Sequence, residues 1–171
     1  GGVYQRQAMF QLIMSANPCP CVYGYGDAER CTCREKDRIR YFSRLSGPIL
    51  DRIDIQVEVP PVERIGRSGE RAAQSSRQMR DDVRQARAAA RQRFADQHWT
   101  CNARASGTWL RANTSASALT LINRALEDHR LSLRGADRAM RLAWTLCDLS
   151  GKNSPGAEEM MQSIALRTRT P

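Results

Sequence analysis

The sequence predicts a fold in two parts, an α/β segment over residues 1–62 followed by an all-α bundle over residues 75–171. Apolar or alternating runs that end at prolines, which are typical of strands, occur only before residue 61. From residue 75 onward apolar residues recur at helical spacing, and alanine and arginine dominate. Residues 63–74 are polar, basic and contain glycine, so we expect them to form a linker.

Composition favours a polyanionic partner. The 171 residues suit one domain of ordinary size or a piece of a larger protein, and they carry a formal net charge of +9. Arginine supplies almost all of the positive charge, which is typical of proteins that bind nucleic acid or nucleotide phosphate, although a merely basic, soluble protein is the alternative. There is no apolar run of about eighteen residues and no signal-peptide core, so we expect a cytoplasmic protein without a membrane partner.

Residues 9–16 are predicted to form a short buried strand, because apolar residues run almost continuously and Asn17-Pro18 closes the segment. Asn17 would then lie just past the carboxyl end of the strand, where open α/β sheets place their ligands. On local signal alone, a simple turn-forming role for Asn17 carries equal weight.

A cysteine-rich insert over residues 17–34 follows this strand. In a reducing compartment, closely spaced cysteines are more often metal ligands than structural disulfides. Four thiolates can converge on one Zn²⁺ if the glycine-containing turn between the pairs folds back, and we therefore expect a structural zinc site. Unliganded thiols or a disulfide across the loop are the alternatives. The expected ligands form two Cys-x-Cys pairs: Cys19, Cys21, Cys31 and Cys33.

A helix and a second strand are predicted next. Residues 35–45 carry apolar side chains at three-residue spacing, which indicates a short helix that breaks at residues 46–48. Residues 53–59 alternate strictly with period two before Pro60-Pro61, which predicts a half-buried strand. Arg52 lies directly before that strand, where it can reach the ligand of a neighbouring subunit; taken alone it would be a solvated surface arginine.

The first helix of the bundle is predicted over residues 75–94, with Ser75 or Ser76 as its N-cap. One apolar stripe should pack inward. A second stripe, roughly 100° away, is a ladder of arginines that can follow the phosphate backbone of DNA or is simply a solvated face. The apolar stripe consists of Met79, Val83, Ala86, Ala90 and Phe94. The arginine ladder consists of Arg77, Arg80, Arg84, Arg87 and Arg91.

Three more helices should complete a four-helix bundle. One begins after Thr114 or Ser115, one runs from about residue 134 to 149 and ends at Gly151, and one opens at Pro155. Trp99 and Trp109 lie in the irregular stretch before these helices, and we expect core anchors rather than platforms for stacked bases. Three arginines project along one side of the helix at residues 134–149: Arg134, Arg138 and Arg141.

Five motifs, in order along the chain, resemble the magnesium-chelatase-like AAA+ ATPases, and within them the competence proteins of the ComM type. No generic motif has this combination, which extends over nearly the whole chain. The motifs are residues 17–21 (NPCPC), 31–33 (CTC), 43–54 (SRLSGPILDRID), 131–134 (LSLR) and 141–149 (RLAWTLCDL).

The resemblance implies a homo-oligomeric ATPase that, at full length, forms a hexameric ring, uses ATP and Mg²⁺ and moves single-stranded or branched DNA. It implies that residues 1–62 are the C-terminal part of the AAA+ α/β core and that the bundle is its helical lid. By position, Asn17 is similar to the sensor-1 residue that orients the attacking water. Arg52 matches the arginine finger, which stabilises transition-state charge on a neighbour's nucleotide. Arg134 fits sensor 2, with Arg141 as the nearby substitute.

The sequence departs from the family pattern in two ways. The family usually has glycine directly after the second cysteine, whereas Val22-Tyr23 precede Gly24 here, which leaves the geometry of the metal loop open. The 171 residues also contain neither a G-x-x-x-x-G-K-[ST] phosphate loop nor an acidic Walker-B cluster. We therefore expect the C-terminal portion of such an ATPase, which alone neither binds ATP tightly nor hydrolyses it. A magnesium-chelatase ATPase subunit and a stand-alone zinc-containing nucleic-acid-binding module are the alternative functions.

Overall fold

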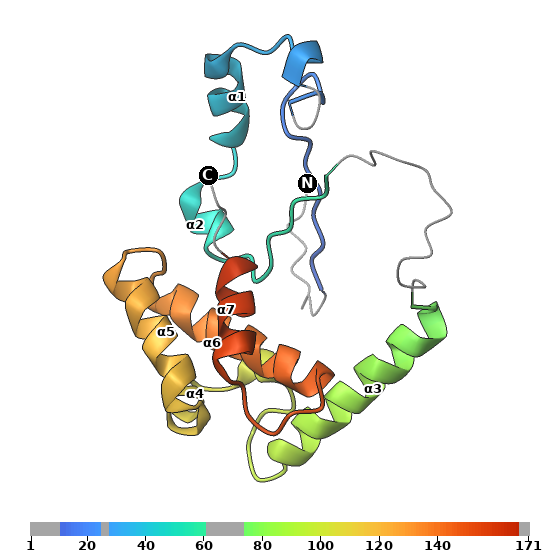
Figure 1. The fold of residues 1–171 in the computed structure, drawn as a ribbon, viewed down its shortest axis with the longest axis vertical. Coiled ribbons are helices and arrows are strands. Elements are labelled where there is room, and N and C mark those ends of the chain that lie inside the picture. Colours follow the sequence, from blue (N-terminus) through green and yellow to red (C-terminus); the bar gives the residue numbers. More distant parts are fainter. Residues whose placement is uncertain (1–10, 25–27, 61–73, 168–171) are drawn as a thin grey trace, which may run out of the picture. The chain divides into compact units, whose positions relative to one another are not determined.

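The structure is a computed structural model that describes residues 11–24, 28–60 and 74–167 (Figure 1). The chain divides into two compact units. The N-terminal unit comprises Gly1–Ser46 and Pro60–Glu63, and the C-terminal unit comprises Gly47–Val59 and Arg64–Pro171. The predicted linker at 63–74 lies outside the described residues except for Gln74. No helix in the described ranges is long and apolar enough to cross a membrane.

The prediction of a strand-containing α/β segment is wrong, because the regular structure in the described part of the chain is entirely helical. Residues 11–16 and 53–59 have the sequence pattern of strands but form none, and Ile13 is 84% and Val59 85% exposed. A strand requires a ladder of hydrogen bonds to a neighbouring strand. The Gln56 N–H does bond outside its segment, but it donates to a carbonyl at the end of a helix, that of Leu166. The alternation alone therefore could not produce a sheet.

The N-terminal unit contains the short 3₁₀ helix η1 (Ala28–Arg30) and the helix α1 (Glu35–Phe42). The predicted helix at 35–45 is thus confirmed over eight residues. α1 buries none of its residues, and Ile39 is 63% exposed. Among the described residues of this unit, Cys19 alone is buried. This unit therefore lacks an apolar core of its own within the described ranges.

The C-terminal unit is helical throughout its described regular structure, and serine side chains cap four of its helices. Ser75, Ser106, Ser115 and Ser132 each accept a hydrogen bond from the backbone N–H three residues later, which satisfies one of the free amides at a helix start. The predicted caps at Ser75 and Ser115 are confirmed. The helices are α2 (Gly47–Leu50), α3 (Ser76–Arg93), η2 (Asn102–Arg104), α4 (Gly107–Asn113), α5 (Ala116–Glu127), α6 (Leu133–Leu149) and α7 (Ala157–Ala165).

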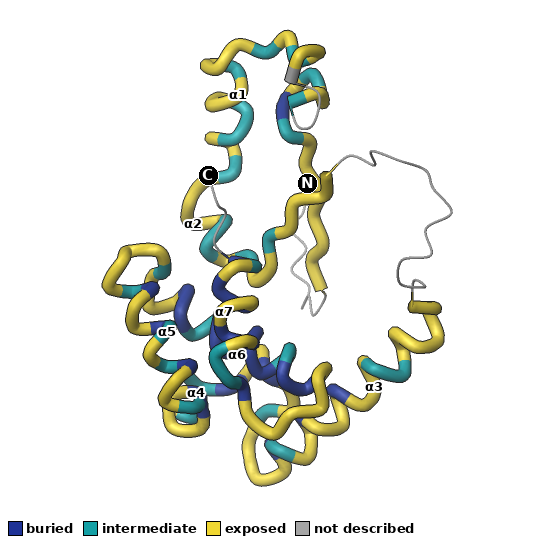
Figure 2. The backbone as a smooth tube through the Cα atoms, viewed as in Figure 1, coloured by how far each residue is buried: buried dark blue, intermediate teal, exposed yellow. Residues whose placement is uncertain are grey.

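α6 is the central helix of this unit and packs against α3, α4, α5 and α7. Buried residues gather along it, as Figure 2 shows. A chain of aromatic contacts leads to it. The ring centroid of Phe94 lies 6.0 Å from that of Trp99 and 4.9 Å from that of Trp109, and the centroids of Trp109 and Trp144 lie 5.2 Å apart. The prediction that Trp99 and Trp109 anchor the core is confirmed. α6 ends where Gly151 adopts a φ of +67°, and the Lys152 N–H bonds to the Cys147 carbonyl, the glycine C-cap that the sequence predicts.

The apolar stripe of α3 is only half buried. Ala86, Ala90 and Phe94 are 8%, 5% and 2% exposed, but Met79 is 50% and Val83 41% exposed. Only the C-terminal half of α3 therefore packs on the core, and its N-terminal half presents all its faces to solvent within the described structure.

Candidate functional site

The four predicted metal ligands converge in the N-terminal unit. Their Sγ atoms all lie within 4.8 Å of one another. Cys19 Sγ lies 3.3 Å from Cys21 Sγ and 3.8 Å from Cys31 Sγ, and the Cys21–Cys31 separation is 3.6 Å. All four thiols are free, which excludes the disulfide alternative in this structure. A tetrahedral ion with metal–sulfur bonds of about 2.3 Å holds its sulfurs about 3.8 Å apart, so the cluster fits one such ion.

The turn after the first cysteine pair has a backbone conformation that favours glycine. Val22 adopts a φ of +68°, a left-handed conformation that is strained for a β-branched residue and free for glycine. The Val22 N–H donates to the Cys19 carbonyl at 3.1 Å. The Gly24 N–H donates to Cys19 Sγ, also at 3.1 Å, and a Cβ on Gly24 would lie only 2.8 Å from that sulfur. Gly24 is thus required for the backbone to approach the ligand.

The thiols of this cluster ionise unequally. A hydrogen bond from the Tyr23 backbone lowers the pKa of Cys21 to about 6. The Cys21 backbone lowers the pKa of Cys33, but the neighbouring Cys21 sulfur and partial burial outweigh it and raise that pKa to about 12. The pKa of Cys31 is also raised: the Cys33 backbone lowers it, but the Cys21 sulfur and burial prevail. A cation at the centre would favour the thiolate form of each.

The remaining predicted residue of this unit, Asn17, is exposed two residues before Cys19. It therefore lies at the entrance to the cysteine turn. The strand that was expected to position it is not present in the described residues.

In the C-terminal unit, Arg52 lies on the turn that follows α2. Its side chain is exposed, and Nη1 donates to the Pro48 carbonyl at 2.6 Å, one turn back along the chain. The side chain thus stays close to its own turn, while the backbone of residues 51–54 is held by groups from α6 and from the end of α7. Those groups are Arg138 and Arg167.

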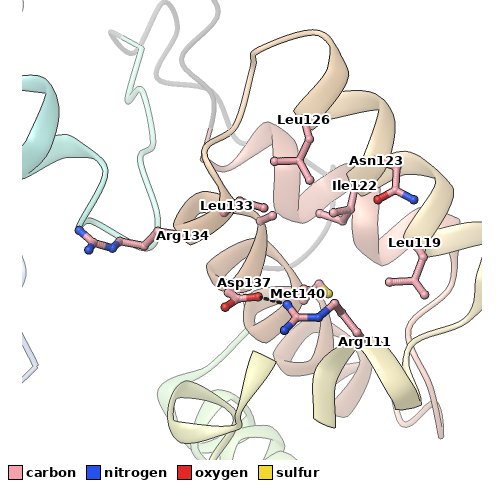
Figure 3. Close-up of a pocket in the computed structure, with 10 residues that line it drawn as sticks. Arg111, Leu119, Ile122, Asn123, Leu126, Leu133, Arg134, Asp137 and Met140 are labelled. Carbon is pink, nitrogen blue, oxygen red and sulfur yellow. Dashed lines mark hydrogen bonds and ion pairs between the residues drawn. The ribbon is translucent and has the colours of Figure 1, made fainter. Parts of the chain in front are cut away.

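The two candidate sensor-2 residues differ in their partners. Arg141 is committed to the core, because its Nε and Nη2 both donate to the Ala105 carbonyl, at 3.1 and 3.0 Å. Arg134 is exposed in the first turn of α6, and Figure 3 shows its guanidinium directed away from the Arg111–Asp137 ion pair. No hydrogen bond of the Arg134 side chain is found within the described ranges. Arg134 can therefore accept a new anionic partner without breaking a contact in them.

A cavity of about 580 Å³ opens beside Arg134, between α4, α5 and α6. It is mainly apolar, with Leu119, Ile122 and Leu126 on its α5 side (Figure 3). Arg111 and Asp137 form its polar edge through a 2.9 Å ion pair.

The arginine ladder is exposed along α3, and each of its five members faces solvent. One salt bridge, of 3.4 Å between Arg84 and Asp81, offsets part of its charge, and both side chains remain at least half exposed. The ladder thus forms one basic helix face next to the half-exposed Met79 and Val83. Such a face can accept phosphates without rearrangement of the core.

Two functional candidates escaped the sequence-based prediction. The sequence placed Arg138 on a stripe of α6 without a partner and gave no functional reason to single out Arg167. In the structure the Arg167 side chain is 2% exposed and binds residues more than a hundred positions earlier. In the sequence, the negative charges of the aspartates at 51 and 54 were the only hint of these contacts, and charge alone does not show which distant residues pair.

Comparison with known proteins identifies the family. Residues 73–167 match the family model described as magnesium chelatase, subunit ChlI C-terminal. The chain belongs to this family. Residues 3–66 of the ChlI-family chain also match the model described as magnesium chelatase, subunit ChlI. The resemblance found in the sequence motifs is confirmed.

Relatives of this ChlI-family chain are longer proteins. An uncharacterized protein of Mycobacterium bovis is 39% identical over 168 residues, which cover 97% of this chain and 33% of that protein. The competence protein ComM of Haemophilus influenzae is 28% identical over 165 residues, covering 95% of this chain and 31% of ComM. The uncharacterized protein YifB of Escherichia coli is 45% identical over 53 residues, 31% of this chain and 10% of YifB. The chain thus spans about a third of the length of the first two relatives.

Proposed function

We propose that this chain supplies the lid, the trans-acting arginine and a DNA-binding face of a ring-forming AAA+ ATPase, a ComM-like motor that drives branch migration of DNA. The observation that carries the proposal is Arg52, which is exposed on a turn whose backbone is held from both sides. A fixed, always-charged guanidinium at a subunit surface suits transition-state charge on a neighbour's nucleotide. The family match and the ComM relative supply the context.

The nucleotide roles divide among residues of both units. ATP and Mg²⁺ would be held by residues of the longer protein, in a ring of identical subunits that we expect to be hexameric and cytoplasmic. Asn17 would orient the attacking water as sensor 1. Arg134 would contact the phosphates of its own subunit's nucleotide as sensor 2, and it suits this role better than Arg141, whose donors are occupied by Ala105. Measurable ATP turnover by the purified chain of 171 residues would contradict this division.

The arginine ladder of α3 would bind the phosphate backbone of single-stranded or branched DNA. Each phosphate contact releases counterions, so the logarithm of affinity should fall linearly with the logarithm of salt concentration. We expect the double variant Arg80→Gln/Arg87→Gln to weaken binding to a four-way junction and to flatten this salt dependence. The matched control, Arg124→Gln/Arg130→Gln, removes the same charge from exposed positions off the ladder. Equal losses of junction affinity in the two variants would mean that overall charge, and not the ladder, determines binding.

The cysteine cluster would hold a structural zinc ion through Cys19, Cys21, Cys31 and Cys33. Sulfur separations close to a tetrahedral edge support this assignment, and four thiolates leave no open coordination position for catalysis.

A second function follows from the name of the matching family, magnesium chelatase. An ATPase subunit of porphyrin metallation would need the lid and Arg52, but neither the cysteine cluster nor the arginine ladder. The junction-binding experiment separates the two functions, since a chelatase subunit is expected to show no salt-dependent preference for branched DNA that depends on the ladder.

A further inference from the structure

The turn that carries Arg52, residues 50–54, is held by two arginines from distant helices. We name it the Arg52 turn. Arg138 Nη1 on α6 donates to the backbone carbonyl of Arg52 at 2.8 Å and to Asp54 Oδ1 at 2.5 Å. The Arg138 side chain is 24% exposed, so this contact is partly shielded from water. Charge-assisted hydrogen bonds of this kind are about twice as strong as neutral ones.

The second arginine approaches the same turn from the end of α7. Arg167 Nη1 donates to the carbonyls of Ile53 (2.9 Å) and Asp54 (3.2 Å), and Nη2 donates to the carbonyl of Asp51 (3.2 Å). The Gln56 N–H, in turn, donates to the Leu166 carbonyl at 2.7 Å. Burial lowers the pKa of Arg167, and its Nε finds no partner among the described residues. Burial of a charged guanidinium is unfavourable unless it is hydrogen-bonded, so Arg167 depends on these carbonyls and in turn holds the backbone that carries them.

Apart from the bond to the Asp54 carboxylate, these contacts go to main-chain carbonyls of the Arg52 turn, and in the described structure none of them involves the Arg52 side chain. Ser132, the N-cap of α6, adds a bond to the same turn through Asp51 Oδ1, at 3.2 Å. The turn is therefore anchored to the first turns of α6 and to the end of α7, while the exposed Arg52 guanidinium bonds to the nearby Pro48 carbonyl.

We propose that Arg138 and Arg167 are positioning residues that hold the backbone of the Arg52 turn against α6 and the end of α7, and so fix the place from which Arg52 reaches a neighbouring subunit's nucleotide. This inference rests on the proposed function for the role of Arg52. The clamp on the turn does not depend on that function. A displacement of about 1 Å in a catalytic group can lower the rate about 100-fold, so loss of the clamp should be measurable as a loss of rate.

The clamp is tested on the chain itself by amide hydrogen exchange. Arg138→Gln should accelerate exchange at Gln56 and Ile53 about tenfold, because it removes a charge-assisted bond to the Arg52 turn. Arg124→Gln, an exposed substitution on α5, is the control and should leave these amides unchanged. Arg138→Lys should restore most of the protection, since one ammonium can donate to both acceptors. Unchanged exchange in Arg138→Gln would overturn the clamp.

The effect of the clamp on Arg52 is tested by ATP hydrolysis of the assembled full-length protein. Arg138→Gln should lower kcat about 100-fold with the KM for ATP unchanged, because the displaced Arg52 acts on the transition state at a neighbouring site. Adding Arg138→Gln to Arg52→Ala should produce no further loss. Normal kcat in Arg138→Gln, together with a large loss in Arg52→Ala, would overturn the inference and leave the proposed function intact. Normal kcat in Arg52→Ala would overturn the proposed function itself.

Discussion

Removal of the proposed zinc ion should unfold the N-terminal unit and leave the C-terminal unit intact. The perturbation is a chelator, or the substitution Cys19→Ser. Cys19 is buried, has two sulfurs within 3.8 Å and accepts a hydrogen bond from the Gly24 amide at 3.1 Å. Its substitution should weaken zinc binding by more than about 100-fold, the upper end of the loss expected when only a group that supports a metal ligand is removed.

The size of the effect follows from what the N-terminal unit lacks. Its described residues bury only Cys19, and α1 has eight residues, below the roughly 12–15 at which an isolated helix becomes even marginal. Structural zinc contributes about 10–16 kcal/mol in small zinc domains, so the metal would be the main stabilising term here. The C-terminal unit keeps its own core around Trp144, Met140 and Leu110.

Elemental analysis and hydrogen exchange together provide the assay. The purified chain should hold one zinc per molecule, and chelation should abolish protection of the α1 amides while the amides of α6 stay protected. Cys101→Ser is the control, because Cys101 is exposed and outside the cluster. Less than about half an equivalent of zinc, or protection of α1 that survives chelation, would refute the reasoning.

The remaining predictions concern single groups. Zinc affinity should fall as pH falls from 9 to 6, because Cys31 and Cys33, whose pKa values are raised (that of Cys33 to about 12), must release their protons to bind metal; competition with a chromophoric chelator measures this. Val22→Gly should stabilise the cysteine loop by about 1 kcal/mol, seen as slower zinc release, since glycine adopts the φ of +68° without strain. Asp148→Ala should destabilise the C-terminal unit by about 3 kcal/mol in urea titrations because it removes the carboxylate partner of the largely buried Arg93 guanidinium, whereas Arg93→Met/Asp148→Leu should be far milder. Burial raises the pKa of the Cys147 thiol from 9.0 to about 11, so stability should be fully present below pH 9 and decline as pH rises toward 11, a decline that Cys147→Ala should reduce.

Local chemistry explains what the sequence predicted well. A serine before an apolar periodic run, and a glycine after one, set the ends of α3, α5 and α6 through bonds within a few residues, as at Ser75 and Gly151. The cysteine cluster could be predicted equally well, because its four cysteines lie within one short segment of the sequence. Helix ends and the metal loop thus depend on neighbours in the sequence.

Features that depend on distant neighbours were not predictable in the same way. The alternation at residues 53–59 and the apolar stripe at Met79 and Val83 indicate faces suited to burial, but they cannot say whether anything covers those faces. In the described structure nothing does, since Val59 and Met79 are at least half exposed. The bond from Arg167 to the Arg52 turn spans more than a hundred positions, and no period or motif encodes it.

The choice between Arg134 and Arg141 illustrates what the contacts add to the motif. The sequence places both on one face of the same helix, and a guanidinium at either position could meet phosphate oxygens. Arg141 already donates two hydrogen bonds to the Ala105 carbonyl in a partly buried setting, and a move toward phosphate would leave that acceptor without them. Arg134 gives up no such bond in the described structure, and it lies one turn from Arg138, which grips the Arg52 turn. The phosphate contact proposed for sensor 2 would therefore require less rearrangement at Arg134 than at Arg141, whose guanidinium would first have to leave the Ala105 carbonyl.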